Sequence, residues 1–73
     1  MTPSQAASMV RKGQGAQGIH RIDPPRVAGE QWHAHLGSGA GSTAINIDGT
    51  WKLGRGTLTE KQADFLRDAG WNV

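Results

Sequence analysis

Alternating hydrophobic and polar residues predict that the middle of the chain is β-sheet. Residues 31–36 read Gln-Trp-His-Ala-His-Leu. Successive side chains of a strand point to opposite faces, so Trp32, Ala34 and Leu36 share one face, which suits a hydrophobic core. His33 and His35 share the other face. Histidine is the side chain that titrates near neutral pH, so this second face is the first place to look for chemistry.

Two more segments have the pattern of strands lying beside this one. Residues 19–23 alternate imperfectly and end at a Pro-Pro pair, which cannot donate to a ladder of hydrogen bonds. Residues 43–47 alternate clearly. Paired antiparallel with residues 31–36, they place Ile45 and Ile47 on the core face and Asn46 on the histidine face.

The pair Asp48-Gly49 predicts the connection to a fourth strand. An Asp-Gly pair between alternating residues is typical of a two-residue type I′ hairpin turn. The turn returns the chain over residues 50–53, where Trp51 and Leu53 face one side of the sheet. Thr50 and Lys52 face the other side.

Helices are predicted at both ends of the chain. Thr2-Pro3 places a capping residue before a proline at the first helical position, and Gly13 ends the short helix that follows. Residues 1–13 fit equally well the remnant of a linker to a larger protein. Thr59 and Gln62 have the spacing of a capping box, an amphipathic stripe follows, and Gly70 stands where a helix ends.

The order of elements predicts an α+β fold. A small antiparallel sheet of three to four strands carries an N-terminal helix and a C-terminal helix packed on one face. With 73 residues, the chain forms a single small domain over residues 1–73, near the lower size for an independent core. A sheet covered on one side leaves its other face to solvent. That face collects the polar residues His33, His35, Asn46, Thr50 and Lys52, with Arg21 or His20 from the first strand.

Composition narrows the possible partners. The chain has no cysteine, which excludes disulfides and thiolate metal sites. We expect no membrane segment, because no apolar run approaches the roughly 18–20 residues of a span. The N-terminus lacks the pattern of a signal peptide, so an export signal would lie elsewhere, for example on a longer parent chain. A net charge of +2 favours an anionic partner only weakly.

The histidine face has the residue types that metal-independent cleavage of RNA requires. This reaction needs a base for the 2′-hydroxyl, an acid for the leaving 5′ oxygen and cations for the charged transition state. His33 and His35 supply the acid and the base in either order. Arg21 and Lys52 supply positive charge, and hydrogen bonds to phosphate come from the polar side chains of Asn46 and Thr50.

Other interpretations of the same residues stay open. The two histidines are also compatible with ordinary exposed strand positions, or with one of them hydrogen-bonding a loop carbonyl. A His-x-His pair can hold zinc with a third ligand from Asp23, Asp48 or His20, although capping a turn is the commonest role of an aspartate like Asp23. We expect no metal and no cofactor.

The glycine-rich segments and the tryptophans allow two further hypotheses. Residues 13–18 fit a flexible connector better than a nucleotide-binding loop, and residues 37–42 are either a flexible link or an anion site built from backbone amides. Trp32, Trp51 and Trp71 are possible stacking platforms for a non-catalytic nucleic-acid module. Because Trp32 and Trp51 fall on the core face, a packing role is favoured for them.

Four segments of the chain resemble a known family. They are Gly-Ile-His-Arg-Ile-Asp at 18–23, Gly-Glu-Gln-Trp-His-Ala-His at 29–35, Ala-Ile-Asn-Ile-Asp-Gly-Thr-Trp-Lys at 44–52 and Phe-Leu-Arg-Asp-Ala-Gly-Trp at 65–71. The pattern resembles the C-terminal toxin domains of bacterial polymorphic toxins of the Rhs and contact-dependent growth inhibition type. These domains end very long secreted proteins, and they include small metal-independent ribonucleases of the barnase/colicin/RelE-like group.

The resemblance implies a metal-independent endoribonuclease toxin domain that cleaves the RNA of competing bacteria. The producer would secrete it as part of a larger delivery protein, and it would act in the cytoplasm of the target cell, where a cognate immunity protein neutralises it. DNases and deaminases occur in the same family, and the strong C-terminal helix here departs from the ribonuclease pattern. The alternative is a non-catalytic basic module that binds nucleic acid or protein. The site residues under the toxin hypothesis are catalytic His33, His35, Arg21 and Lys52, with His20, Asn46 and Thr50 binding substrate.

Overall fold

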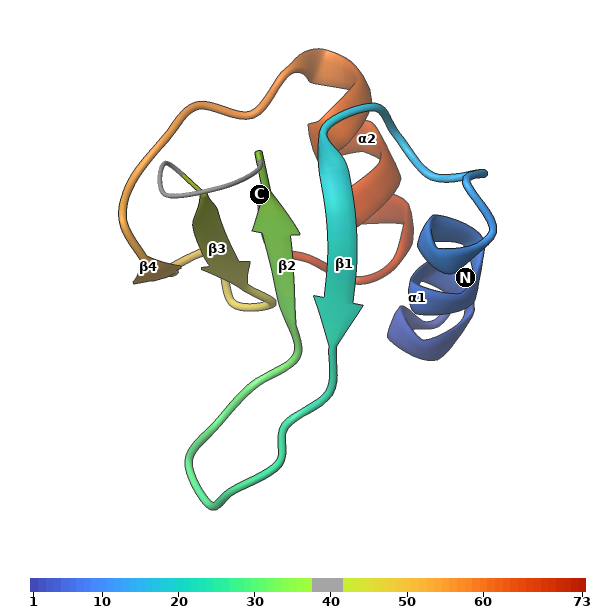
Figure 1. Cartoon of the computed structure of the whole chain (residues 1–73). Coiled ribbons are helices and arrows are strands. Elements are labelled where there is room, and N and C mark those ends of the chain that lie inside the picture. The colour runs from blue at the N-terminus through green and yellow to red at the C-terminus, as the bar shows by residue number, and fades with distance from the viewer. Residues whose placement is uncertain (38–41) are drawn as a thin grey trace.

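The computed structural model confirms the α+β fold and describes residues 1–37 and 42–73. The anion site predicted within residues 37–42 falls mostly outside the described residues. Figure 1 shows the sheet with both helices beside and behind it. The elements are α1 (Pro3–Arg11), β1 (Ile19–Asp23), β2 (His33–Leu36), β3 (Thr43–Asn46), β4 (Trp51–Leu53) and α2 (Glu60–Asp68).

The sheet is an antiparallel meander with its four strands in chain order. Two rows of cross-strand neighbours define its faces. Ile22 lies opposite Ala34, which lies opposite Ile45, and all three are buried in the core. The adjacent row runs from Asp23 through His33 to Asn46. In the middle of the sheet, the alternation therefore predicts correctly which residues face the core and which face the opposite side.

An irregularity in β1 explains why that segment alternates imperfectly. Ile19 pairs with Leu36, whereas Arg21 pairs with His35, so β1 has one more residue than β2 between these two pairs. Such a bulge changes which residues face the core. Ile19 and Ile22 are both buried, and Arg21 lies across from His35.

Each helix begins with a reciprocal capping box. Thr59 Oγ1 accepts from the backbone N–H of Gln62 at 3.1 Å, and the Gln62 side chain accepts from the Thr59 N–H at 3.0 Å, as the sequence predicts. Thr2 and Gln5 make the same pair of bonds at the start of α1.

Neither helix in the described residues is long and apolar enough to cross a membrane.

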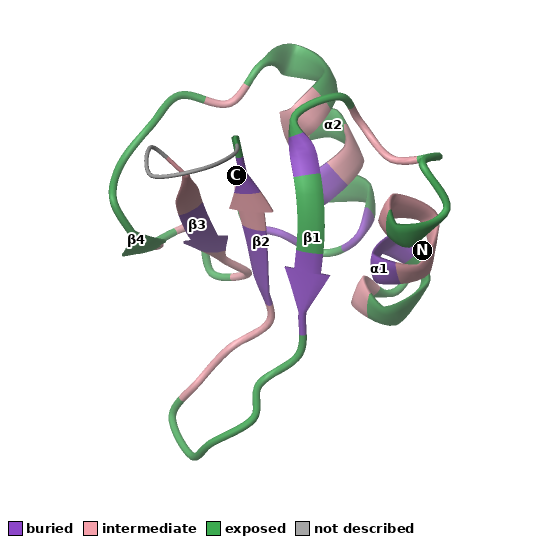
Figure 2. Cartoon of the chain, viewed as in Figure 1, coloured by how far each residue is buried: buried purple, intermediate pink, exposed green. Residues whose placement is uncertain are grey.

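The core receives residues from both helices and from the first three strands (Figure 2). After α2 the chain turns back, and the indole of Trp71 is buried with 2% of its surface exposed. Trp32 and Trp51 pack against the core but are only partly buried. The buried residues of the core are Ala6, Ala7, Ile19, Ile22, Ala34, Leu36, Ile45, Leu66, Ala69 and Trp71.

The β3–β4 connection differs from the predicted type I′ turn. A type I′ turn needs a positive φ angle at both of its central residues. Gly49 has φ +92°, but the φ angle of Asp48 is not positive. The Gly49 N–H donates to the Asn46 carbonyl at 2.9 Å, and the Asn46 N–H donates to the Thr50 carbonyl at 2.8 Å. The loop therefore has three residues, with glycine in the left-handed position that closes it. The error arose because an Asp-Gly pair suits both loop lengths.

Replacing Gly49 with alanine should destabilise the fold by more than the roughly 1–2 kcal/mol that a left-handed conformation costs an ordinary residue. A Cβ at this position would collide with the backbone carbonyl oxygen of Asn72. Gly13→Ala is the matched control, because Gly13 has φ +75° but a Cβ there would meet nothing within 4 Å. Equal losses of unfolding free energy in urea for the two variants would contradict the role of the Asn72 contact.

Candidate active site

Four side chains converge on the face of the sheet opposite the core. Arg21 and Asp23 come from β1, and His33 and His35 come from the paired positions of β2. One carboxylate oxygen, Asp23 Oδ2, lies 2.8 Å from Arg21 Nε, 3.3 Å from His35 Nε2 and 3.8 Å from His33 Nε2. We call these four residues the Asp23 cluster.

Asp23 is the centre of this cluster and is buried, with 6% of its surface exposed. A buried carboxylate is costly unless positive groups and hydrogen-bond donors surround it. Arg21 meets this need at contact distance, and Arg26 Nη2 lies 4.0 Å from the other oxygen, Oδ1. The side chain of Arg21 remains 57% exposed, so it covers the cluster from the solvent side.

His33 is buried, with 5% of its surface exposed, which corrects the expectation that both histidines lie on an open face. Its Nδ1 lies 2.8 Å from the carbonyl oxygen of Gln31. A carbonyl only accepts, so Nδ1 carries a hydrogen and donates it. Nε2 is left turned toward Asp23. Alternation assigned the correct face, but it gave no account of the neighbouring side chains that cover the ring.

His35 is held between a cation and an anion. Its Nε2 lies 3.2 Å from Arg21 Nη2, which only donates, so Nε2 accepts and the imidazole is neutral in this contact. Burial lowers the pKa of His35 from its ordinary value, and the positive charge of Arg21 lowers it further, while the negative charge of Asp23 acts in the opposite direction. The side chain is 16% exposed and so lies nearer to solvent than His33.

His20 borders the cluster without joining it. It is the extra residue of the β1 bulge and is exposed, and its ring centroid lies 6.0 Å from that of His35. The rings of His33 and His35 are 5.2 Å apart and meet edge to face. His20 is therefore a neighbour of His35 at the edge of the Asp23 cluster.

The remaining predicted site residues have other hydrogen-bond partners. Lys52 Nζ lies 3.1 Å from Glu30 Oε2, and the pKa of Glu30 is lowered first by the backbone N–H of Arg26 and then by Lys52. Asn46 lies across from His33 and donates to Thr50 Oγ1 at 3.1 Å.

Thr50 in turn donates to Asp48 Oδ1 at 2.6 Å. This bond, followed by those from the Thr50 backbone N–H and the Gln31 side chain, lowers the pKa of Asp48. The structure thus brings Arg21, His33 and His35 together on Asp23, and it places Lys52 on a different carboxylate.

Asp23 is the central residue that the sequence did not single out for catalysis. It entered only as a turn cap and as one of three possible zinc ligands. The available signal was the Arg-x-Asp spacing in β1, which places both charges on one face just as His-x-His does in β2. One ligand atom from each of Asp23, His33 and His35 lies within 4.8 Å of the other two, so these three residues are also able to hold a metal ion.

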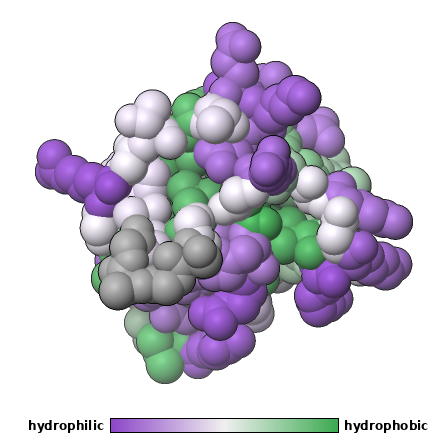
Figure 3. Space-filling model, turned by 45° about the horizontal axis from the view of Figure 1, so that its top comes forward, coloured by the Kyte–Doolittle hydropathy of each residue, from purple (hydrophilic) through white to green (hydrophobic). Residues whose placement is uncertain are grey.

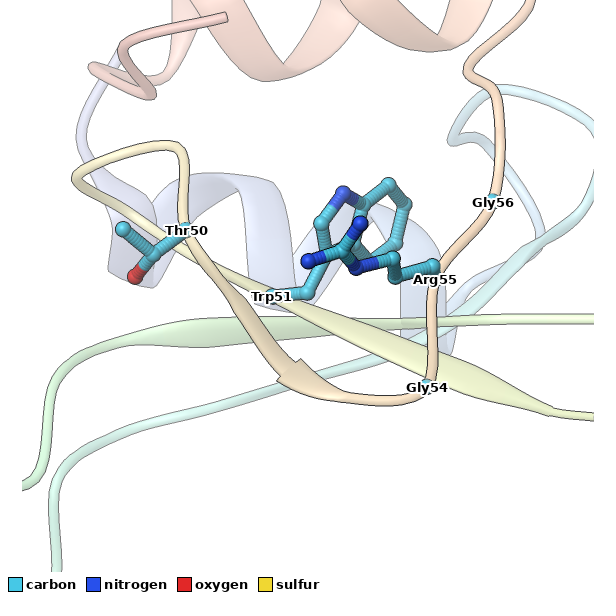
Figure 4. Close-up of a pocket in the computed structure, with 5 residues that line it drawn as sticks. All are labelled: Thr50, Trp51, Gly54, Arg55 and Gly56. Atoms are coloured by element: carbon cyan, nitrogen blue, oxygen red, sulfur yellow. The ribbon is translucent and has the colours of Figure 1, made fainter.

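A pocket lies at β4 and the loop that follows it. Thr50, Trp51, Gly54, Arg55 and Gly56 line it, and Figure 4 shows the side chains of Trp51 and Arg55 at this pocket. Aromatic and guanidinium groups are both able to stack on nucleobases. On the face presented in Figure 3, hydrophobic residues lie between projecting hydrophilic side chains.

Comparison of the chain with protein-family models, with curated proteins and with solved structures finds no match in any of the three. The case for function therefore depends on the residues and geometry described above.

Proposed function

We propose that the chain is a metal-independent endoribonuclease domain whose chemistry takes place at the Asp23 cluster. One observation carries the proposal. Two imidazoles, given different hydrogen-bonding roles by their partners, converge with an arginine on one buried carboxylate. Cleavage of RNA requires this combination of base, acid and positive charge.

The hydrogen bonds support a division of the two proton-transfer roles, whose order the sequence left open. His35 presents an unprotonated Nε2 and is the general base, which removes the proton of a ribose 2′-hydroxyl. His33 holds a hydrogen on Nδ1 through Gln31 and turns Nε2 toward Asp23, and we assign the role of general acid to this second imidazole. Asp23 is the positioning residue for both rings.

The proposed reaction is an internal transesterification. The 2′ oxygen loses its proton to His35 and attacks the phosphorus, and the bond from phosphorus to the 5′ oxygen breaks. That oxygen takes a proton from His33, which leaves a 2′,3′-cyclic phosphate and a 5′-hydroxyl. Arg21 is exposed and leaves His35 to bind the phosphate, where it stabilises the charge of the transition state. Lys52, His20, Asn46 and Thr50 are proposed to contact the flanking RNA.

The resemblance to toxin tips supports a biological setting for this activity. We propose that a larger delivery protein carries the domain out of the producer and that the domain acts on RNA in the cytoplasm of a target cell. A cognate immunity protein would protect the producer. The exposed Arg21 and Arg26 beside the cluster would give an acidic immunity protein a direct way to block it.

A second candidate function is favoured by the pocket at Trp51 and Arg55. A non-catalytic module would bind single-stranded nucleic acid there by stacking and charge, and its affinity would fall with salt. This alternative gives no role to the convergence on Asp23, so we place it second.

The first test is incubation of the purified chain with total bacterial RNA, with and without EDTA. We expect cleavage that persists in EDTA and that is lost in the His33→Asn/His35→Asn double variant, because both Nε2 atoms are then absent. The same variant should relieve growth arrest when the chain is expressed in bacteria without an immunity protein. Cleavage that EDTA abolishes would overturn metal independence, and a complete absence of cleavage would make the binding module the leading candidate.

A further inference from the structure

The Asp23 cluster has a second chemical capacity that RNA cleavage does not use. Three potential ligand atoms, from Asp23, His33 and His35, lie within 4.8 Å of one another. We propose that these three residues bind one divalent transition-metal ion of the zinc class. Binding of the ion would displace Arg21 from the cluster.

Two of the three separations between the ligand atoms are close to those of a zinc site, and the third is at most 4.8 Å. Zinc binds nitrogen and oxygen ligands at about 2.0–2.2 Å, so neighbouring ligands of a tetrahedral ion lie about 3.3–3.6 Å apart. His35 Nε2 is 3.3 Å and His33 Nε2 is 3.8 Å from Asp23 Oδ2. Small side-chain movements would therefore bring all three atoms into contact with one ion.

The donor types and their outer partners also fit a metal site. Two imidazole nitrogens and a carboxylate oxygen favour zinc, nickel or copper over magnesium or calcium, which prefer oxygen ligands. The bond from His33 Nδ1 to the Gln31 carbonyl turns Nε2 inward, as backbone carbonyls do for metal-binding histidines. Three protein ligands leave a fourth coordination position for water.

In the structure, the positive group at the proposed metal site is the Arg21 side chain. Its Nε contacts Asp23 and its Nη2 contacts His35, so it holds two of the three ligand residues. Because its side chain is mostly exposed, Arg21 is able to leave without unpacking the core. Metal and arginine are therefore expected to compete. A bound ion would also occupy both Nε2 atoms, so it would inhibit RNA cleavage; this last consequence depends on the proposed ribonuclease function.

Metal binding is tested directly by titrating the purified chain with Co²⁺, whose visible absorption reports its ligands, and with Zn²⁺ by calorimetry. We expect one ion per chain and no binding of Mg²⁺. His35→Asn should weaken binding by at least the roughly 10–100-fold that outer-sphere changes alone cause. His33→Asn should also weaken metal binding, while its side-chain amide keeps a donor near the position of Nδ1 for the Gln31 carbonyl. His20→Gln is the matched control, because His20 lies outside the ligand set and should leave the affinity unchanged.

Two arginine variants separate this site from a general effect of charge. Arg21→Gln and Arg26→Gln each remove one positive charge near Asp23, but only Arg21 contacts two ligand residues. Zinc binding should tighten by about tenfold or more in Arg21→Gln, since the ion no longer competes with a cation at contact distance from Asp23 Oδ2 and His35 Nε2. A much smaller gain is expected in Arg26→Gln. Equal gains, or binding that the His33 and His35 variants leave intact, would overturn the proposal.

Inhibition of RNA cleavage by zinc is measured separately from zinc binding. Zinc at saturating concentration should stop cleavage, and EDTA should restore it. Because binding is measured by absorption and calorimetry, a chain that binds zinc but cleaves no RNA would refute the ribonuclease and leave the site standing. A chain that cleaves RNA but binds no zinc would refute only the site.

Discussion

Replacing His35 with asparagine is expected to lower the rate of RNA cleavage by about 10²–10⁴-fold, the contribution typical of one general acid or base. Asparagine is shorter than histidine and removes Nε2, the atom that faces both Arg21 and Asp23. The side chain of His35 is partly exposed, so the core loses little packing. The loss should appear in kcat, because the proton transfer occurs only in the transition state.

The measurement is single-turnover cleavage of a short RNA, together with thermal unfolding to show that the variant is folded. Lys61→Gln is the control, because Lys61 is exposed on α2, an element that contributes no residue to the Asp23 cluster. The control should cleave at nearly the rate of the unmodified chain. A folded His35→Asn variant with the same rate as this control would remove His35 from the chemistry.

The faces of the sheet were predictable because side-chain alternation is a local property of a strand. His33 and His35 follow it, and so do Ala34 and Leu36, all within one short segment. The capping box at Thr59 was predictable for the same reason, since its two residues are three positions apart. These features depend only on near neighbours in the sequence.

The Asp23 cluster depends instead on the register between two strands. Asp23 meets His33, and Arg21 meets His35, only after residues 24–32 have looped back and fixed the register between β1 and β2. The geometry of that loop cannot be obtained from alternation. Alternation therefore identified the two histidines as site residues, but not Asp23, whose carboxylate lies beside both rings. It also could not show that Lys52 pairs with Glu30, 22 positions away.

Trp71→Ala is expected to reduce the free energy of unfolding by about 3–5 kcal/mol, the usual cost of removing a buried large aromatic side chain. The indole is 2% exposed, and its Nε1–H donates to the Ile45 carbonyl at 3.2 Å. A domain of 73 residues has a stability of roughly 4–11 kcal/mol, so this loss removes much or all of it. Urea unfolding followed by circular dichroism measures the change.

Two further variants identify the source of the loss. Trp71→Phe keeps an aromatic ring but removes the Nε1–H that donates to the Ile45 carbonyl, and the loss of one hydrogen bond should cost about 0.5–1.5 kcal/mol. Trp51→Ala removes the same side chain from a partly exposed position and should cost less than Trp71→Ala. If Trp51→Ala is the more damaging, the core is not centred on Trp71.

Ile45 lies in β3, next to the strand that carries both histidines, so Trp71 also supports the sheet that positions the Asp23 cluster. Loss of cleavage in Trp71→Ala should accordingly follow the unfolded fraction and vanish when low temperature restores the fold.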